Sequence, residues 1–168
     1  MELIFSLIVE LAEYERAREQ VSGTPELLAR ALFGPEPVAE ALIAELDGRP
    51  VGFALFYTTF STWETRPGLW LEDIYVPPEH RRGGIGEALL REVAAIGVRR
   101  GCARLEWTAL HWNEPALRFY RKLGARRLDD WVLHRLDGSA LEAVAGEAAG
   151  REAAGGDPRG PRHPAPAG

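Results

Sequence analysis

A glycine-rich turn is the first place where this sequence suggests chemistry. It reads Arg81-Arg82-Gly83-Gly84-Ile85-Gly86, and a helix is predicted to begin at Gly84. A helix N-terminus presents unpaired N–H groups and a partial positive charge. Glycines let that backbone approach a phosphate or pyrophosphate without an intervening Cβ, and the two arginines add charge. The same residues are equally compatible with a plain loop, and their spacing fits neither a P-loop nor a dinucleotide fingerprint.

Two neighbouring acids, Glu72 and Asp73, lie in a predicted strand that is otherwise apolar. An acid pair in the middle of a strand beside a sheet core is unusual, although such acids often merely face water. Successive side chains of a strand point to opposite faces, so both acids can reach one ligand only if a bulge intervenes.

A later predicted helix begins at Asn113 and ends at Gly124. Asn113 is a suitable N-cap, with Pro115 in the first turn and glycine as the stop signal. Tyr120 lies on this helix beside Phe119. Taken alone, a tyrosine in that position would more often be a core residue than a catalytic one.

The elements that must position these residues follow from periodicity and turn signals. Thr24 can cap a helix whose first residue is Pro25, Asp47-Gly48 predicts a hairpin, and Pro77-Pro78 ends a strand. The predicted order is helix 2–20, a short helix from residue 25, strands 38–46, 51–60 and 70–76, helix 84–100, strand 104–109, helix 113–124, strand 131–136 and the start of a short helix at 141–144.

Composition restricts the class of protein. A chain of 168 residues, 46% hydrophobic and 27% charged, is long enough for one domain with a single core. No apolar run is long enough to span a bilayer, and the N-terminus does not resemble a signal peptide. One cysteine, Cys102, excludes an internal disulfide and favours the cytoplasm, and the four histidines show no metal-ligand spacing. The net charge of −5 argues against nucleic acid as a partner and suits a cationic substrate.

The C-terminal residues 146–168 are rich in Gly, Ala, Pro and Arg and contain no large apolar side chain. Nothing in this stretch can offset the entropy of ordering. We therefore expect a folded domain over 1–145 and a disordered tail over 146–168.

Four segments in this order resemble the GCN5-related N-acetyltransferase (GNAT) superfamily and, within it, the spermidine/spermine and thialysine acetyltransferases. The turn at 81–86 is similar to the superfamily's acetyl-CoA turn. Three further segments are similar to the narrower diamine branch: Leu71-Glu72-Asp73, Trp112-Asn113-Glu114-Pro115, and Phe119-Tyr120 followed by Gly124-Ala125. Segments 11–15 and 19–21 also match that branch, so the resemblance covers residues 3–136.

The resemblance implies an α+β fold with a mixed, mostly antiparallel sheet and helices on both faces. It implies direct transfer of the acetyl group of acetyl-CoA, without a metal, to a primary amine of a small diamine, polyamine or lysine-like compound. Acetyl-CoA would lie between the central strand and the strand at 104–109. The implied cofactor-binding residues are Ile74, Tyr75, Val76, Arg81, Arg82, Gly83, Gly84, Ile85, Gly86, Glu87 and Asn113.

The resemblance also assigns roles in catalysis. Tyr120 would give a proton to the departing CoA thiolate, which suits a phenol of pKa about 10. Glu72 would contact the amine and relay its proton. An alkyl amine of pKa about 10.4 is only about 0.1% neutral at neutral pH, and only the neutral form attacks. The implied amine-binding residues are Tyr14, Glu15, Trp63, Glu72, Asp73 and either Asp129 or Asp130.

Two departures from the family pattern qualify these expectations. The segment 127–131 is shorter than in the family, which leaves open whether Asp129 or Asp130 holds a distal ammonium group. The chain also begins inside the first helix, so either its true start lies upstream, which we favour, or the sheet lacks its first edge strand. Family members form dimers whose sites use both subunits, and a homodimer is therefore expected.

Three alternatives compete with this interpretation. The first is acetylation of another amine, such as a peptide N-terminus or an amino sugar. The second is a CoA-binding regulatory module without turnover, against which Tyr120 and Glu72 together argue. The third is nucleic-acid binding through Arg81, Arg82, Arg99 and Arg100, which the acidic net charge disfavours.

Overall fold

The computed structural model describes residues 1–154. The chain forms two compact units: the first is Met1–Leu117, and the second begins at Arg118.

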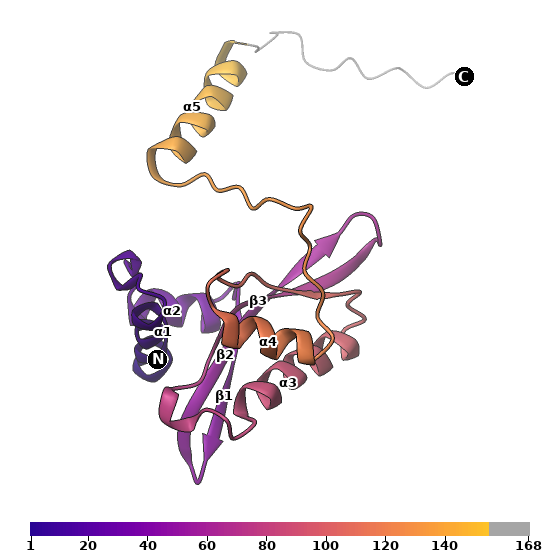
Figure 1. Cartoon of the computed structure of the whole chain (residues 1–168). Helices are drawn as coiled ribbons and strands as arrows, with labels where there is room; N and C mark the ends of the chain where they lie inside the picture. Colours follow the sequence, from indigo (N-terminus) through magenta and orange to yellow (C-terminus); the bar gives the residue numbers. More distant parts are fainter. Residues whose placement is uncertain (155–168) are drawn as a thin grey trace, which may run out of the picture. The chain divides into compact units, whose positions relative to one another are not determined.

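The first unit is organised around a twisted sheet (Figure 1). Within the described residues this sheet has four strands in the order β1-β2-β3-β4: Glu40–Leu46, Arg49–Ser61, Arg66–Tyr75 and Leu105–Glu106. Neighbours among β1, β2 and β3 run antiparallel, and β4 pairs with β3 in parallel. The mixed α+β fold is confirmed, but β4 is much shorter than the predicted strand 104–109 because only two of its residues pair with β3.

The hairpin between β1 and β2 confirms the turn predicted at Asp47-Gly48. Asp47 has φ 52° and Gly48 has φ 71°. Positive φ at both central residues is what a two-residue hairpin of this kind requires, and Asp and Gly tolerate it at low cost.

Helices flank the sheet: α1 Glu2–Tyr14, α2 Pro25–Phe33 and α3 Ile85–Arg99, with short 3₁₀ helices at Arg18–Gln20 and Pro78–His80. The predicted cap of α2 is confirmed, since Thr24 Oγ1 accepts a hydrogen bond from Leu27 N. The predicted helix 2–20 is wrong beyond Tyr14. Arg16 takes a left-handed conformation (φ 60°) and Ala17 N donates to Ala12 O, which closes α1 early.

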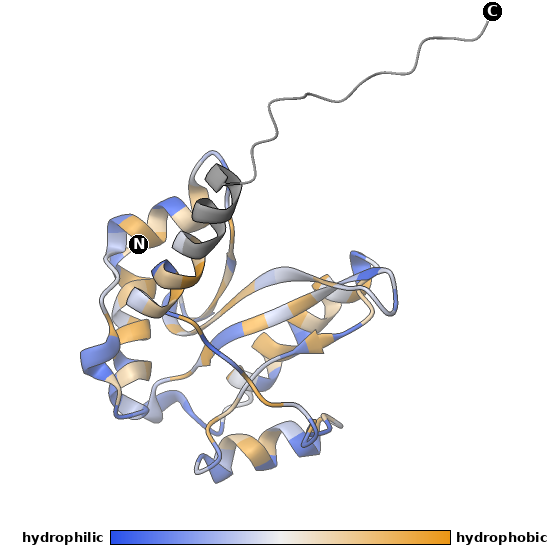
Figure 2. Ribbon diagram, turned by 90° about the horizontal axis from the view of Figure 1, so that it is seen from above, coloured by the Kyte–Doolittle hydropathy of each residue, from blue (hydrophilic) through white to orange (hydrophobic). Residues whose placement is uncertain are grey.

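The two faces of the sheet bury different clusters. Phe53, Leu55 and Tyr75 pack with Ile4, Leu7 and Leu32 from α1 and α2. On the opposite face, Leu69 lies against α3, where a Cβ added at Gly97 would be 3.3 Å from Leu69 Cδ1. Figure 2 shows the hydrophobic residues of the first unit concentrated in the sheet and its helices. These clusters fix α1 and α3 on opposite faces of β2 and β3.

Helix α4, Glu114–Lys122, crosses from the first unit into the second, and Gly124 (φ 86°) follows it as predicted. The predicted strand 131–136 is wrong, because these residues form neither strand nor helix. Trp131, Val132 and Leu133 are 68%, 74% and 68% exposed. An alternating apolar sequence gives β-propensity, but a strand forms only where another backbone completes its ladder.

The last helix, α5, spans Gly138–Ala154 and is longer than the short helix predicted at 141–144. The predicted tail 146–168 overlaps its second half, and residues 155–168 lie outside the described part of the chain. The domain boundary at 145 therefore stays a prediction. Among residues 1–154, no helix combines the length and apolarity needed to cross a membrane.

Candidate active site

A bulge in β3 brings the two neighbouring acids onto one face of the sheet. Leu55 pairs with Asp73 while the next residue of β2, Phe56, pairs with Leu71, so the register passes over Glu72. Glu72 is therefore the extra residue of a β-bulge, which the sequence argument required if both acids were to face one ligand.

The pairing shows which face this is. Residues directly opposite each other on neighbouring strands share a face. Asp73 lies opposite Leu55 and Tyr75 opposite Phe53, and both partners belong to the cluster under α1 and α2. Glu72 lies on the same side, because Trp70 Nε1 donates to Glu72 Oε2 at 2.9 Å and Trp70 faces away from the Leu69 side. Both acids therefore face α1.

Glu15, which directly follows α1, adds a third carboxyl group to this region. Burial, the charge of Glu72 and the charge of Glu15, in that order of importance, raise the pKa of Asp73 to about 6. Burial also raises the pKa of Glu15. Glu72 and Glu15 thus disfavour the ionisation of Asp73, and a cation bound beside these three acids would be stabilised.

Sequence reasoning missed the two aromatic neighbours of Glu72. Besides the Trp70 indole, Tyr57 of β2 lies opposite Trp70, and burial together with the Glu72 charge raises the pKa of the Tyr57 phenol. No sequence signal separates these residues from ordinary strand aromatics, because their contact with Glu72 depends on the bulge.

The predicted cofactor segment of β3 lies beyond the point where pairing with β4 ends. β4 pairs with Leu69 and Trp70, and within the described residues no β4 partner is paired with β3 beyond them. On their other side, Ile74 and Tyr75 pair with Ala54 and Phe53. Within the described residues, the β3 edge from Leu71 onward thus has no strand paired to it on that side, which suits an extended ligand.

The glycine turn follows this strand. Arg82 and Gly84 both have positive φ (68° and 82°), and Gly84 is the N-cap of α3 without a side-chain cap. No side-chain cap therefore accepts from the first turn of α3, whose backbone N–H groups at Ile85 and Gly86 suit an anionic ligand. Gly83 and Gly84 are exposed, and the Glu87 carboxylate pairs with Arg91 at 2.8 Å.

Tyr14 and Asn113, predicted in separate roles, are in direct contact. Asn113 Oδ1 accepts a hydrogen bond from Ala116 N at 3.3 Å, which confirms the predicted N-cap of α4. The same oxygen accepts one from Tyr14 Oη at 3.2 Å. The Tyr14 ring lies 4.6 Å from the Arg81 guanidinium carbon, measured to the ring centroid.

The remaining predicted residues lie on the β2–β3 hairpin and in the second unit. Trp63 is 85% exposed in the loop between β2 and β3. In the second unit, Tyr120 is half-buried with its ring 5.2 Å from that of Phe119. Asp129 Oδ1 pairs with Arg127 Nη2 at 2.9 Å, and Asp130 is exposed. Tyr120, Asp129 and Asp130 keep their roles as predictions.

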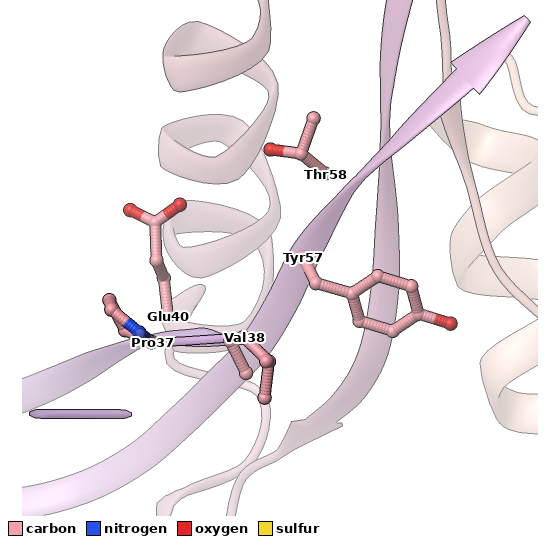
Figure 3. A pocket seen from close by; sticks show the side chains of 6 residues that line it. Pro37, Val38, Glu40, Tyr57 and Thr58 are labelled. Atoms are coloured by element: carbon pink, nitrogen blue, oxygen red, sulfur yellow. The ribbon is translucent and has the colours of Figure 1, made fainter. Parts of the chain in front are cut away.

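A pocket of about 310 Å³ lies at the edge of the sheet where β1 begins (Figure 3). It is lined by Pro37, Val38, Ala39, Glu40, Tyr57 and Thr58. Glu40 pairs with Phe56, so β2 continues past β1 from Tyr57 onward and leaves this hollow. None of the predicted site residues lines it. Among the described residues, no group of three or more His, Cys, Asp or Glu side chains could hold a metal ion.

A β3 edge without a second partner strand, a glycine turn before α3 and a group of neighbouring acids are compatible with an enzyme that binds an extended anionic cofactor and a cationic acceptor. The model of the Acetyltransferase (GNAT) family matches residues 6–125, and this chain belongs to that family. It is therefore an N-acetyltransferase.

Curated relatives and solved structures agree with this assignment. Thialysine N-epsilon-acetyltransferase of Bos taurus is 39% identical over 155 residues, covering 86% of this chain and 91% of the relative. The protein of the same name in Caenorhabditis elegans is 34% identical, covering 87% and 91%. An integron cassette protein from the mobile metagenome of V. cholerae superimposes with a TM-score of 0.68 at 26% identity, covering 82% and 86%.

Proposed function

We propose that this N-acetyltransferase transfers the acetyl group of acetyl-CoA directly to a primary amine of a small diamine, polyamine or lysine-like compound. Its thialysine N-epsilon-acetyltransferase relatives, similar over most of both chains, support a lysine-like acceptor. The observation that carries the proposal is the bulge at Glu72, which turns both Glu72 and Asp73 toward the face of α1.

The acids explain how a doubly charged amine is bound and activated. Glu15 and Asp73 attract the cation and hold it at the α1 face. Glu72, held by the Trp70 indole, accepts the proton of the reacting ammonium group. The neutral nitrogen then attacks the acetyl carbonyl carbon, the N–C bond forms, and the C–S bond breaks. Tyr120 gives its phenolic proton to the departing sulfur, and the second proton that the nitrogen loses as the amide forms passes to the resulting Tyr120 phenolate.

The chain's own residues fit the acetyl-CoA that the family uses. Bound acetyl-CoA supplies an activated acetyl thioester. Backbone groups of Ile74–Val76, at the open edge of β3, would hold its pantetheine arm. The N–H groups from Arg82 to Glu87 would hold its pyrophosphate, because Gly84 caps α3 without a side chain. Asn113 would contact the cofactor arm from the start of α4.

We also propose that the enzyme works as a homodimer. The segment 131–136 supports this, because Trp131, Val132 and Leu133 expose neighbouring apolar side chains in a stretch of high β-propensity. A second copy could cover them. Light scattering of the full chain gives the mass, and a monomeric mass at micromolar concentration contradicts the proposal.

We propose in addition that Asp129 or Asp130 binds the distal ammonium group of the amine.

A single cysteine supports a reducing cytoplasm as the site of action, and catalysis would need no metal. Activity that persists after treatment with a chelator is the expected result for the second point.

The decisive experiment measures free CoA thiol released from acetyl-CoA with a panel of amines. The panel contains thialysine, lysine, putrescine, spermidine, spermine, a peptide and an aminoglycoside, since some solved neighbours are described as aminoglycoside or ribosomal-protein-alanine acetyltransferases. Mass spectrometry identifies the acetylated product. The matched control is Glu72→Gln, which keeps the shape of the side chain but cannot accept the proton.

Fastest turnover on a small diamine or lysine-like amine, lost in Glu72→Gln, is the expected result. Fastest turnover on the peptide or the aminoglycoside would replace the proposed substrate class. Binding of CoA without turnover on any amine would favour a regulatory module instead.

A further inference from the structure

A cluster of aromatic and cationic side chains joins three segments of the first unit that are distant in sequence. It contains Tyr14 at the end of α1, Tyr75 at the end of β3, Arg81 in the glycine turn, and Trp112 and Asn113 at the start of α4. Under the proposed function, α1 leads to the amine site, whereas the turn and Asn113 belong to the cofactor site.

Arg81 is fixed in this cluster from two sides. Its Nε donates to Val76 O at 2.8 Å, which ties the side chain to the end of β3. Its guanidinium carbon lies 4.6 Å from the Tyr14 ring centroid and 5.7 Å from that of Tyr75. A planar cation against two ring faces is favourable and depends on orientation, which a lysine cannot reproduce.

Tyr14 is likewise held from several sides. Its hydroxyl donates to Asn113 Oδ1 at 3.2 Å, and its ring lies 6.0 Å from the Trp112 ring. Asn113 Oδ1 is at the same time the cap of α4. The Tyr14 hydroxyl thus donates to a residue that the proposed function places on the cofactor side, while Tyr14 itself follows the helix that leads to the amine site.

Glu15 connects this cluster to the acids. It is the next residue after Tyr14 and acts electrostatically on Asp73. Tyr14 and Glu15 are consecutive residues at the end of α1, just before the turn at Arg16 (φ 60°). A movement of Arg81 or Asn113 that shifts Tyr14 therefore also shifts Glu15.

We propose that Tyr14 and Arg81 are positioning residues that couple the cofactor site to the amine site, so that bound CoA fixes Glu15 for the amine. Ordering of the turn and of Asn113 by CoA restrains Tyr14, and Tyr14 restrains Glu15. The coupling is reciprocal, because two ligands that affect each other's binding do so by the same factor. This inference rests on the proposed function.

The test measures equilibrium binding by calorimetry with CoA, the product, so that no turnover occurs. The Kd of thialysine, or of whichever panel amine is turned over fastest, is determined with and without saturating CoA, and the Kd of CoA with and without the amine. We expect saturating CoA to tighten the binding of the amine to the wild-type protein about fivefold or more. In Tyr14→Phe, which loses the hydroxyl, and in Arg81→Lys, which loses the planar group, the factor should fall to below about twofold.

Controls separate coupling from general damage. Arg99→Lys changes an arginine of α3 that pairs with Glu92 and lies outside the cluster, so the coupling factor should stay at the wild-type value. Thermal unfolding shows whether each variant is folded. The double variant Tyr14→Phe/Arg81→Lys should lose no more coupling than either single variant, because both act through one contact network.

The outcomes are distinguishable from failure of the proposed function. If the wild-type enzyme acetylates its amine but shows no coupling, or if the folded variants retain it, the inference is overturned and the function stands. If the wild-type protein acetylates no amine, the proposed function itself falls, and with it the meaning given to this cluster.

Discussion

Replacing Asp73 by Asn should stabilise the folded chain at neutral pH. Asp73 has a pKa of about 6 against an ordinary value of 3.8, chiefly because it is buried and secondly because Glu72 and Glu15 are negative. At about 1.36 kcal/mol per pH unit, the carboxylate costs up to about 3 kcal/mol of folding free energy once it is fully ionised. Asparagine has nearly the same shape and carries no charge.

The sign gives a specific pH dependence. Between its ordinary pKa and about 6, the folded chain holds the Asp73 proton more tightly than the unfolded chain does. The contribution of this group to stability therefore falls as pH rises through that window. Asp73→Asn should match the wild type near pH 4 and exceed it increasingly up to about pH 6, with a constant advantage above.

Urea unfolding at a series of pH values between 4 and 8 measures this difference. Glu45→Gln, an exposed carboxylate of β1, is the control for removing one negative charge from a chain of net charge −5. An advantage of Asp73→Asn that is independent of pH, or no larger than that of Glu45→Gln, would refute the electrostatic reasoning. The same variant should bind the cationic amine more weakly, so the gain in stability comes with a loss of function.

Three other substitutions test separate parts of the site. Tyr120→Phe should lower turnover by about 10²-fold or more while CoA affinity persists in calorimetry, and unchanged turnover would remove Tyr120 from the mechanism. Glu15→Gln should mainly raise the KM for a diamine in the thiol-release assay; an unaltered KM would exclude Glu15 from the amine site. Gly52→Ala should destabilise the fold by about 1–3 kcal/mol in urea, because its Cβ would lie 2.8 Å from Tyr75 O. Gly23→Ala, with its nearest atom 3.9 Å away, is the matched control and should be close to neutral.

The local features of this fold could be predicted because the responsible residues are adjacent in sequence. The hairpin depends on the φ angles of Asp47 and Gly48 themselves. The caps at Thr24 and Asn113 each accept a hydrogen bond from a backbone N–H three residues later. The early end of α1 was not predicted, because arginine is not a residue type that favours the left-handed conformation found at Arg16.

Features that depend on distant partners were predicted poorly or only by family resemblance. The segment 131–136 has the composition of a strand, yet its pairing would depend on another backbone. The bulge at Glu72 follows from the mismatch between β2 and β3, which no single strand reveals. For the same reason, the Trp70 contact with Glu72 and the Tyr14 contact with Asn113 could be found only in three dimensions.

The bulge also makes the length of β3 a constraint in its own right. Leu69 and Tyr75 are six positions apart and would share a face in a regular strand, yet one packs against α3 and the other beneath α1. Deleting a single residue between them would remove the bulge and restore simple alternation, so Tyr75 and Asp73 would keep their face but two neighbouring acids could no longer share it. The loop at 62–65, by contrast, can gain or lose residues without reversing any strand. Insertions and deletions among functional variants should accordingly spare 70–75 and accumulate at 62–65.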